Sequence, residues 1–408
     1  MIDAAYIKSI QLENIRAFKK MEVDLAADGG QRMVSVIIGR NGTCKTTLLR
    51  CIALGLCHES DAAALLAEFG GRLISEDADK GCVKLELADY YGKEIGEIQL
   101  LLENKKGRDV LLNRKSSGFD ADFFVCGYGP NRGTYGTSIV RDYRVLDSVA
   151  TLFDYHRSLV DIELMLRRLE DYLGTSRYTR VQRGIKRVLG LGDEHSIQYV
   201  KGGGVSISGP GIGENIHLEG WADGCRMTFN WLIDLYGWAM HADVVTESGG
   251  IRGILLIDEI DQNMHPSMQS RLLSELQEAL PEMQIFAITH SPLTALGTTA
   301  ENVISLQRKD EGIQLVPIPS LAGYSADDAL MEENLFGTDP YPQTTRRKID
   351  RHRELAAIPH EKRTRGLETE MKELAAELSP EELPPHKDDP VIKKLDRITE
   401  LLEKEKGS

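Results

Sequence analysis

The hydrophobic pattern of the N-terminal part predicts strands followed by a helix. Apolar and polar residues alternate over residues 6–25, which indicates two strands joined as a hairpin. The continuous apolar run at 33–38 predicts a strand that is buried on both faces. After a glycine-containing loop, residues 46–56 have the apolar spacing of a helix.

The middle of the chain changes from strand patterns to helix patterns. Strand-like alternation covers residues 83–103, with turns expected at Gly92 and Gly96. A further strand is predicted at 122–126. From residue 143 to residue 191 the pattern is helical and highly charged, so a helical segment is expected there.

Two buried-strand runs in the C-terminal half flank a helix. The runs at 254–257 and 285–288 are wholly apolar, and residues 268–280 between them have helical spacing. An aromatic-rich helix is expected at 221–241, ahead of the first run. This alternation of strands and helices predicts an α/β fold in which helices cover both faces of a parallel or mixed central sheet.

The composition is that of a globular protein of two or three structural units. The chain has 408 residues, of which 41% are hydrophobic, and a formal net charge of −14. Its apolar runs are far shorter than the roughly 20 residues that cross a bilayer, and a secretion signal is not recognisable, so we expect a cytoplasmic protein without a membrane partner. The six cysteines have neither metal-ligand nor disulfide spacing and are expected to be reduced thiols.

A phosphate-binding loop is predicted at residues 39–47, with the sequence GRNGTCKTT. It lies between a predicted strand and a predicted helix, which is the context that a GxxxxGK[ST] loop requires. Backbone N–H groups and the helix N-terminus bind phosphate, Lys45 reaches the terminal phosphates, and Thr46 holds Mg²⁺. The predicted ATP-binding residues are Gly39, Arg40, Asn41, Gly42, Thr43, Cys44, Lys45, Thr46 and Thr47. The alternative is a Gly-Thr loop that precedes a helix without binding nucleotide.

Cys44 stands where this loop pattern has its last glycine. A thiol at a helix N-terminus beside a lysine is expected to be reactive, because positive surroundings stabilise the thiolate. The alternative is that Cys44 is a small buried residue, tolerated because the backbone there is not left-handed. Fast labelling by iodoacetamide, with protection by ATP, would distinguish the reactive thiol.

Two carboxylates and a histidine end the two buried strands of the C-terminal half. Because ligands bind at the carboxyl edge of parallel sheets, Asp258 is predicted to coordinate Mg²⁺, and Glu259 to orient and deprotonate the attacking water. His290 is predicted to donate a hydrogen bond to the γ-phosphate or to the water. Catalysis is thus assigned to Glu259, His290 and Lys45. The alternative is an exposed acidic strand end and a structural histidine.

The order of these motifs resembles that of the ABC-type ATPase heads of the SMC, RecF and OLD group. LENIRAF at 12–18 resembles their N-terminal strand turn, GRNGTCKTTLL their Walker A motif, LLIDEIDQNMHP their Walker B motif, and AITHSP their switch histidine. YGPNR at 128–132 resembles a motif in the ATPases of bacterial anti-phage systems, including the PtuA and AriA types. The resemblance implies an ATPase that uses ATP and Mg²⁺, and it adds Arg16 to the nucleotide-binding residues.

The match to an LSGGQ-like signature is degenerate. It is WADGCR at 221–226, in which Ala222 lacks the hydroxyl usually offered to the γ-phosphate, while Asp223 and Gly224 are the predicted nucleotide contacts. Losing one charge-assisted hydrogen bond costs roughly 1.5–3 kcal/mol. The resemblance implies that ATP on one chain is capped by the signature of a second chain, in a homodimer or higher homo-oligomer.

The resemblance also implies an organisation for the chain. We expect an α/β P-loop NTPase of the ABC type with a mixed central sheet. Residues 1–142 form the N-terminal part of the head, with Walker A and an antiparallel β subdomain, and 143–200 form a helical insertion. Residues 201–340 form the C-terminal part of the head, and 341–408 form a charged helical tail.

Basic residues are clustered in two places. A stripe suited to gripping phosphates is expected on one helix, with a solvated helix face as the alternative, at Arg177, Arg180, Arg183 and Lys186. A second cluster begins the tail, at Arg346, Arg347, Lys348, Arg351 and Arg353. We find no nuclease pattern, because the histidines of the tail lack HNH-like neighbours and no DxD run of the Toprim kind follows the ATPase motifs.

These features predict an ATP-hydrolysing head whose nucleotide-driven association controls a separate effector. The effector is expected to be a nuclease or toxin in bacterial anti-phage defence, because the chain itself has no second active-site pattern. One alternative is a nucleotide-dependent scaffold with little hydrolysis, which Cys44 and Ala222 favour. Another is a DNA repair ATPase of the RecF/SMC kind, which the basic stripe would allow.

Overall fold

The chain forms two compact units in a computed structural model that describes residues 5–27, 30–118, 123–132, 136, 142–200, 204–359 and 362–378. The first unit comprises Met1–Thr338 and the second Asp339–Ser408. Within the described residues, no helix is both long and apolar enough to cross a bilayer.

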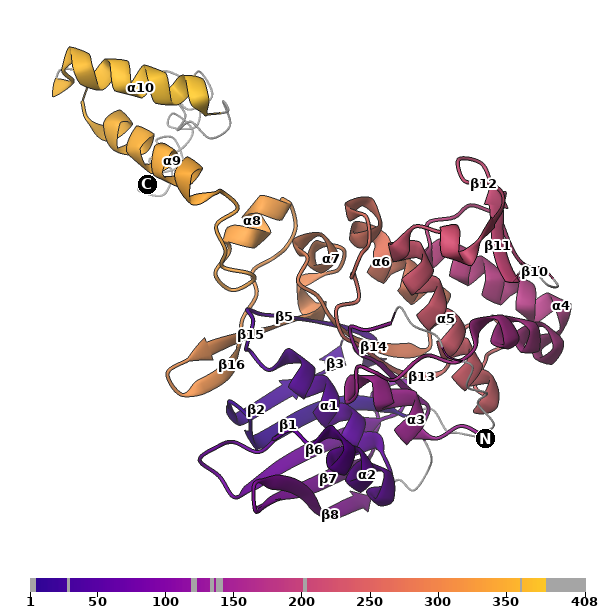
Figure 1. Ribbon diagram of the computed structural model, residues 1–408. Coiled ribbons are helices and arrows are strands. Elements are labelled where there is room, and N and C mark those ends of the chain that lie inside the picture. The colour runs from indigo at the N-terminus through magenta and orange to yellow at the C-terminus, as the bar shows by residue number, and fades with distance from the viewer. Residues whose placement is uncertain are drawn as a thin grey trace, which may run out of the picture. The chain divides into compact units, whose positions relative to one another are not determined.

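A six-stranded sheet forms the centre of the first unit (Figure 1). In spatial order it consists of β16 (Gly312–Val316), β15 (Val303–Lys309), β5 (Val34–Ile38), β14 (Met283–Ile288), β13 (Gly253–Ile257) and β9 (Val125–Tyr128). All neighbouring strands are parallel except for β16, which is antiparallel to β15. The expected α/β fold with a mixed central sheet is therefore confirmed.

Successive residues of the central strands pack into two different hydrophobic cores. Val36 and Leu255 belong to one core, whereas their neighbours Ile37 and Leu256 belong to the other. This division follows from the alternation of side chains along a strand. Helix α1 (Lys45–Leu56) contributes to the second core, which lies between the central sheet and an antiparallel sheet. Both faces are covered, which explains why the sequence of these strands is continuously apolar.

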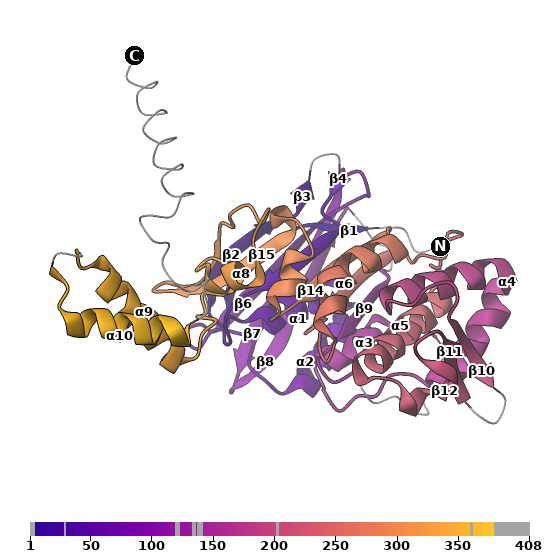
Figure 2. The ribbon, with the colours of Figure 1, turned by 90° about the horizontal axis from the view of Figure 1, so that it is seen from above.

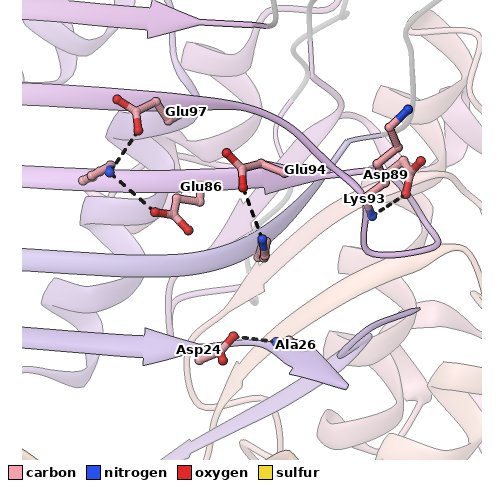
Figure 3. A network of polar contacts seen from close by, with 9 residues as sticks. Asp24, Ala26, Glu86, Asp89, Lys93, Glu94 and Glu97 are labelled. Atoms are coloured by element: carbon pink, nitrogen blue, oxygen red, sulfur yellow. Dashed lines mark hydrogen bonds and ion pairs between the residues drawn. The ribbon is translucent and has the colours of Figure 1, made fainter. Parts of the chain in front are cut away.

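The antiparallel sheet covers α1 on the side away from the central sheet. Its order is β2 (Phe18–Asp24), β1 (Tyr6–Ile15), β6 (Lys80–Ala88), β7 (Glu94–Lys105) and β8 (Arg108–Ser117). In β6 the buried residues alternate with polar ones, and the polar face carries ion pairs (Figure 3). Lys84 lies 3.5 Å from Glu86 and 2.9 Å from Glu97. One face of this sheet is thus core and the other is solvated.

Two predictions for this region are wrong in detail. Gly92 adopts φ +83° in the turn between β6 and β7, as expected, but Gly96 lies within β7 and pairs with Leu87. The register shifts beside this pair, which is typical of a glycine inside a strand. The strand predicted at 122–126 is β9, which begins only at Val125, and residue 122 lies outside the described residues.

Helices cover the other face of the central sheet. They are α4 (Ile162–Val188), α5 (Asp223–His241) and α6 (Pro266–Ala279), with a small sheet of β10 (Ser196–Val200), β11 (Gly204–Gly209) and β12 (Gly213–His217) beside them. Figure 2 shows α4, α5 and β10–β12 together at one end of the first unit. The small sheet was not predicted, because its strands are short and rich in glycine.

The predicted helical segment is only partly helical. Helix α4 begins at Ile162, where the Asp161 side chain accepts a hydrogen bond from the Leu164 backbone and caps the helix. Gly174 interrupts the helix with φ +68° and ψ 164°. The other strands and α-helices among the described residues of the first unit are β3 (Ala26–Ala27), β4 (Gly30–Gln31), α2 (Glu59–Phe69), α3 (Val145–Val149), α7 (Pro292–Leu296) and α8 (Ala326–Met331).

The described part of the second unit is a pair of helices, α9 (Gln343–Ala357) and α10 (Arg365–Glu377). Ion pairs join them, among them Arg351 with Glu370 at 2.7 Å and Lys348 with Glu377. Arg346 pairs with Asp339 and Asp350, each at 3.3 Å. Three of the five cations in the second basic cluster are therefore paired within their own unit.

Candidate nucleotide site

The predicted motifs converge on one cavity at the carboxyl edge of the central sheet. Its volume is about 1130 Å³, and its lining includes Asn41, Gly42, Cys44, Lys45, Thr46, Thr47, Asp258, Glu259 and His290. These residues follow β5, β13 and β14, which are neighbours in the sheet. Parallel strands bring their carboxyl ends to the same edge, so segments more than 200 residues apart in the chain meet there.

Lys45 and Thr46 connect the phosphate loop with the first of the two carboxylates. The Thr46 hydroxyl donates to Oδ2 of Asp258 at 2.6 Å. Lys45 Nζ donates to the carbonyl oxygens of Gly39 at 2.8 Å and Arg40 at 3.2 Å. Burial lowers the pKa of Lys45, and the nearby charges of Asp258 and Glu259 oppose this effect. The ammonium group is thus held inside the loop by the loop's own carbonyl groups.

The backbone of the loop explains its glycine pattern. A Cβ atom at Gly39 would come within 2.4 Å of the Leu306 carbonyl oxygen, so only glycine fits there. Cys44 is the N-cap of α1, with φ 59° and ψ 26°, and is half-buried. The alternative interpretation of Cys44, as a buried residue at a position that is not left-handed, is therefore wrong. A non-glycine residue in this conformation is strained by roughly 1–2 kcal/mol. The reactivity of its thiol stays a prediction.

The carboxylates and the histidine differ in their exposure. Asp258 is buried, Glu259 is half-buried with a left-handed φ of 48°, and His290 is exposed at the cavity. Desolvation lowers the pKa of His290, and the positive charge of Lys45 lowers it further. The imidazole is therefore neutral at pH 7 and can both donate and accept a hydrogen bond.

Other cations from outside the phosphate loop also line the cavity. Arg16 lines it, as predicted, and so do Lys19, Arg72, Arg308 and Lys309, which were not predicted. Nη2 of Arg308 donates to the Gly42 carbonyl oxygen at 3.3 Å. The predicted ligand Arg40 directs its side chain elsewhere, because Nη2 donates to the carbonyl oxygen of Gly337. Arg40 does not line the cavity, and its carbonyl oxygen accepts from Lys45 and Thr43, so its contact with nucleotide stays a prediction.

The donor set at the cavity fits Mg²⁺. The oxygens of Thr46 and Asp258 are hard ligands of the kind that Mg²⁺ prefers, and this ion usually takes its remaining ligands from phosphate and water. Within the described residues, no group of three or more His, Cys, Asp and Glu side chains could hold a metal ion. Any Mg²⁺ here would thus depend on the nucleotide for much of its coordination.

Two protein-family models match the chain. An AAA domain matches residues 9–163, which include the phosphate loop, and a model described as "AAA domain, putative AbiEii toxin, Type IV TA system" matches residues 232–296, which include Asp258, Glu259 and His290. The chain therefore has AAA-type sequence in both segments that meet at the cavity. The expectation of an ATPase-type domain is confirmed at the level of the AAA domain.

The chain is similar to curated proteins over parts of their length. It is 22% identical to the Septu protein PtuA of Bacillus mycoides over 351 residues, which are 81% of this chain and 45% of PtuA. It is 37% identical to the "Retron Vc95 probable ATPase" of Vibrio cholerae over 79 residues, 19% of this chain and 15% of that protein. The chain spans less than half the length of these two relatives.

Solved structures of ATPase heads are more distant. The SMC head domain from Thermotoga maritima is 16% identical, with a TM-score of 0.45 over 77% of this chain and 99% of that one. The recombination mediator protein RecF is 15% identical, with a TM-score of 0.39 over 77% of this chain and 99% of that one.

The signature-like residues at 221–226 do not line the nucleotide cavity that the described residues form. Ala222 is the N-cap of α5, without a side-chain cap, and Asp223 pairs with Arg226 at 2.6 Å. A Cβ atom at Gly224 would come within 2.3 Å of the Asn263 carbonyl oxygen, so glycine lets α5 approach the loop after Walker B. The predicted contacts of Asp223 and Gly224 with nucleotide are thus not made within one chain.

The basic stripe on α4 contacts other segments of the same chain. Arg177 donates to the Val245 carbonyl oxygen at 2.5 Å, and Arg180 donates to that of Glu247. Lys186 donates to the His195 carbonyl oxygen at 3.1 Å, and Arg183 lies 3.8 Å from Asp193. Arg177 and Lys186 are half-buried and bind the loops beside α4, whereas Arg180 and Arg183 are exposed, as the solvated alternative expects. Phosphate binding by this helix stays a prediction.

Sequence reasoning missed the role of one buried arginine at the site. Arg132, the last residue of YGPNR, donates to the backbone carbonyl oxygens of Asp258 and Glu259. The motif itself was recognised in the sequence. Its partners were not, because an arginine that binds backbone carbonyls leaves no mark on the sequence of the segment it binds.

Proposed function

We propose that this chain binds Mg-ATP in the cavity and hydrolyses it to ADP and phosphate. The observation that supports the proposal is the convergence of Lys45, Thr46, Asp258, Glu259 and His290 on one cavity. These side chains supply a cation for the phosphates, a metal-binding pair, a base and a neutral hydrogen-bonding group. Phosphoryl transfer requires this combination, since its catalysis consists mostly of positioning and charge stabilisation.

Each residue has a separate task in this mechanism. The phosphates of ATP replace the Gly39 and Arg40 carbonyls as acceptors for Lys45, whose charge stabilises them. Glu259 accepts the proton of the attacking water, and His290 orients that water or the γ-phosphate through a hydrogen bond. Mg²⁺, held by Thr46 and Asp258, would neutralise charge on the phosphate oxygens when bound.

The test of hydrolysis is Glu259→Gln. Loss of the base is expected to slow turnover by roughly 10²- to 10⁴-fold and to leave ATP affinity unchanged. Phosphate release and binding of a fluorescent ATP analogue measure the two quantities separately. Glu278→Gln is a matched control, since Glu278 is exposed and pairs with Arg187 on the surface. Equal turnover in Glu259→Gln and the wild type would refute the assignment of the base.

In the same proposal, ATP joins two heads. The N-terminus of α5 has no side-chain cap, so its backbone N–H groups can bind an anion. This N-terminus does not line the nucleotide cavity of its own chain. A second copy can supply it, and hydrolysis then removes the phosphate that both chains share. Glu259→Gln with ATP should therefore sediment as a dimer or larger species, and with ADP as a monomer. A monomer in both conditions would contradict the sandwich.

The proposed role of this association is to control a separate nuclease or toxin in anti-phage defence. The names of the relatives support it: Septu PtuA, a retron ATPase and a family model named for a toxin of a toxin–antitoxin system. The test is copurification with the product of the adjacent gene, together with phage challenge of cells that carry both proteins. A chain that protects cells alone, or copurifies with no effector, would refute this role.

A nucleotide-dependent scaffold is the second candidate function. Ala222 offers no hydroxyl at the signature, and Cys44 strains the phosphate loop, so both features favour slow turnover. A wild type that binds ATP and turns it over as slowly as Glu259→Gln would support the scaffold. A repair function would instead require salt-sensitive DNA binding that Arg180 and Arg183 contribute to.

A further inference from the structure

Arg132 lies beneath the turn that carries the two carboxylates. It follows β9, which is parallel to β13, and Tyr128 of β9 is opposite Ile257 of β13. The segments that continue beyond these two residues are therefore neighbours as well. Only 2% of Arg132 is exposed, which makes it one of the largest fully buried side chains of the described residues. Its charge is thus directed at the protein and not at solvent.

The guanidinium group holds two consecutive carbonyl groups. Nη1 donates to the carbonyl oxygen of Asp258 and to that of Gly129 at 3.2 Å, while Nη2 donates to the carbonyl oxygen of Glu259 at 2.6 Å. This contact uses the fixed fork of arginine, whose nitrogen atoms lie in one plane. Lysine has a single nitrogen on a flexible stem, and it cannot reproduce the geometry.

The held turn is strained. Glu259 has a left-handed φ of 48° although it is not glycine, and such a conformation persists only where the surroundings impose it. The Asp258 N–H donates to the Tyr128 carbonyl at 2.8 Å, and the Ile260 N–H to the Ile288 carbonyl at 3.0 Å. These backbone bonds fix both sides of Glu259, and Arg132 fixes its carbonyl group. The direction of the Glu259 side chain depends on all three contacts.

A buried charge of this kind requires compensation. Burial lowers the pKa of Arg132 to about 10, while the carboxylates of Asp258, Glu259 and Asp261 oppose the effect. The Nε atom has no hydrogen-bond partner within the described part of the chain. A group that serves only to fill space here would be apolar, since desolvation of a charge is unfavourable. The charge and fork of arginine therefore point to a role at the turn.

We propose that Arg132 is the positioning residue of the catalytic turn: it binds the carbonyl groups of Asp258 and Glu259 and thereby fixes where their carboxylates enter the cavity. This inference rests on the proposed ATP hydrolysis at the same site. Arg132 does not line the nucleotide cavity, so its effect is on the placement of the catalytic groups and not on the binding of ATP.

The test compares Arg132→Lys and Arg132→Ala with the wild type. Both variants are expected to lower kcat by about 10²-fold, the size of effect that a displacement of about 1 Å of a catalytic group produces, with the Kd for ATP unchanged. Millimolar guanidinium should restore part of the kcat of Arg132→Ala, and sodium chloride at equal ionic strength should not. Arg363→Ala is the matched control, because Arg363 also donates to two backbone carbonyls, those of Ile358 and Ala356.

A second measurement does not depend on turnover. Hydrogen exchange of the amides at 258–262 should be faster in Arg132→Lys than in the wild type, with exchange of α1 unchanged. If the wild type hydrolyses ATP, and Arg132→Lys has the same kcat and the same amide exchange rates as the wild type, the positioning role is overturned. Loss of kcat and ATP affinity together, without rescue by guanidinium, would also overturn it. A wild type that binds ATP without hydrolysing it would instead refute the proposed function, while the exchange experiment still tests Arg132.

Discussion

Replacing Asp234 with asparagine is expected to stabilise the protein at neutral pH but not in acid. Asp234 lies on α5 and is 2% exposed. It accepts hydrogen bonds from the Tyr128 hydroxyl at 2.7 Å and from the Val160 backbone N–H at 2.9 Å. Burial raises the pKa of this carboxyl to about 6, and the two hydrogen bonds oppose the rise without cancelling it.

The size of the effect follows from that pKa. A carboxyl whose pKa is higher in the folded state binds its proton more tightly there, so its stabilising contribution is complete below the usual value of 3.8 and is lost as the pH rises through about 6. The difference between these values corresponds to about 3 kcal/mol at neutral pH. Asparagine has almost the same shape, does not ionise, and still accepts from Val160. The gain in Asp234→Asn should therefore grow from near zero at pH 4 to about 3 kcal/mol at pH 7.5.

Urea unfolding of both proteins at these two pH values measures the difference directly. The difference between the free energies of unfolding of the variant and the wild type cancels the contributions of the titrating groups that both proteins share. Asp243→Asn is the control, because Asp243 also accepts from a tyrosine hydroxyl, that of Tyr172, but is exposed. Its effect on the free energy of unfolding shows what loss of the charge does at an exposed position with a similar hydrogen bond. A gain in Asp234→Asn that is equal at pH 4 and pH 7.5, or a loss at pH 7.5, would refute the reasoning.

Two further predictions concern the cavity. Cys44→Gly should raise the free energy of unfolding by about 0.5–1 kcal/mol, because relief of left-handed strain exceeds the entropy that glycine adds to the unfolded chain, whereas Cys44→Ala should give no gain. Urea unfolding decides this, and equal gains in both variants would contradict it. The pKa of His290 is lowered, so protonation of His290 should decrease kcat/KM only below pH 6.5. In His290→Gln this decrease of kcat/KM at acidic pH should be absent. A decrease that begins above pH 6.5 and persists in the variant would exclude His290 as its source.

The sequence was sufficient to predict that the phosphate loop, the two carboxylates and His290 meet at one cavity. Strand patterns placed Lys45 after one buried strand and Asp258 after another, and the edge rule for parallel sheets then brought them together. The proximity of Thr46 and Asp258, which are 212 residues apart, follows from that rule, although their hydrogen bond was not predicted. This success depends on periodicity, which is a property of each short segment by itself.

The features that escaped prediction depend on contacts between segments. Nothing local distinguishes an arginine that will bind the carbonyls of another strand end, as Arg132 does, from one that faces solvent. The spacing of Arg177 and Arg180 was visible, but the carbonyl groups that they bind belong to a loop after α5. The left-handed backbone at Cys44 was missed for a related reason, because the fold imposes it on a residue that does not favour it.

The segment from Tyr128 to Arg132 joins the two parts of the proposed mechanism. Tyr128 binds Asp234 on α5, the helix that begins at the signature-like residues. Arg132, four residues after Tyr128 in the chain, binds the carbonyl group of Glu259. If a second chain's nucleotide binds the N-terminus of α5, as proposed, it would act on a helix that Tyr128 connects to the strand end behind the proposed base Glu259. The burial of an ionisable group at Asp234 lowers stability at neutral pH, as argued above, so packing alone does not explain this residue. Its bond to Tyr128 gives α5 a fixed position relative to the catalytic edge of the sheet.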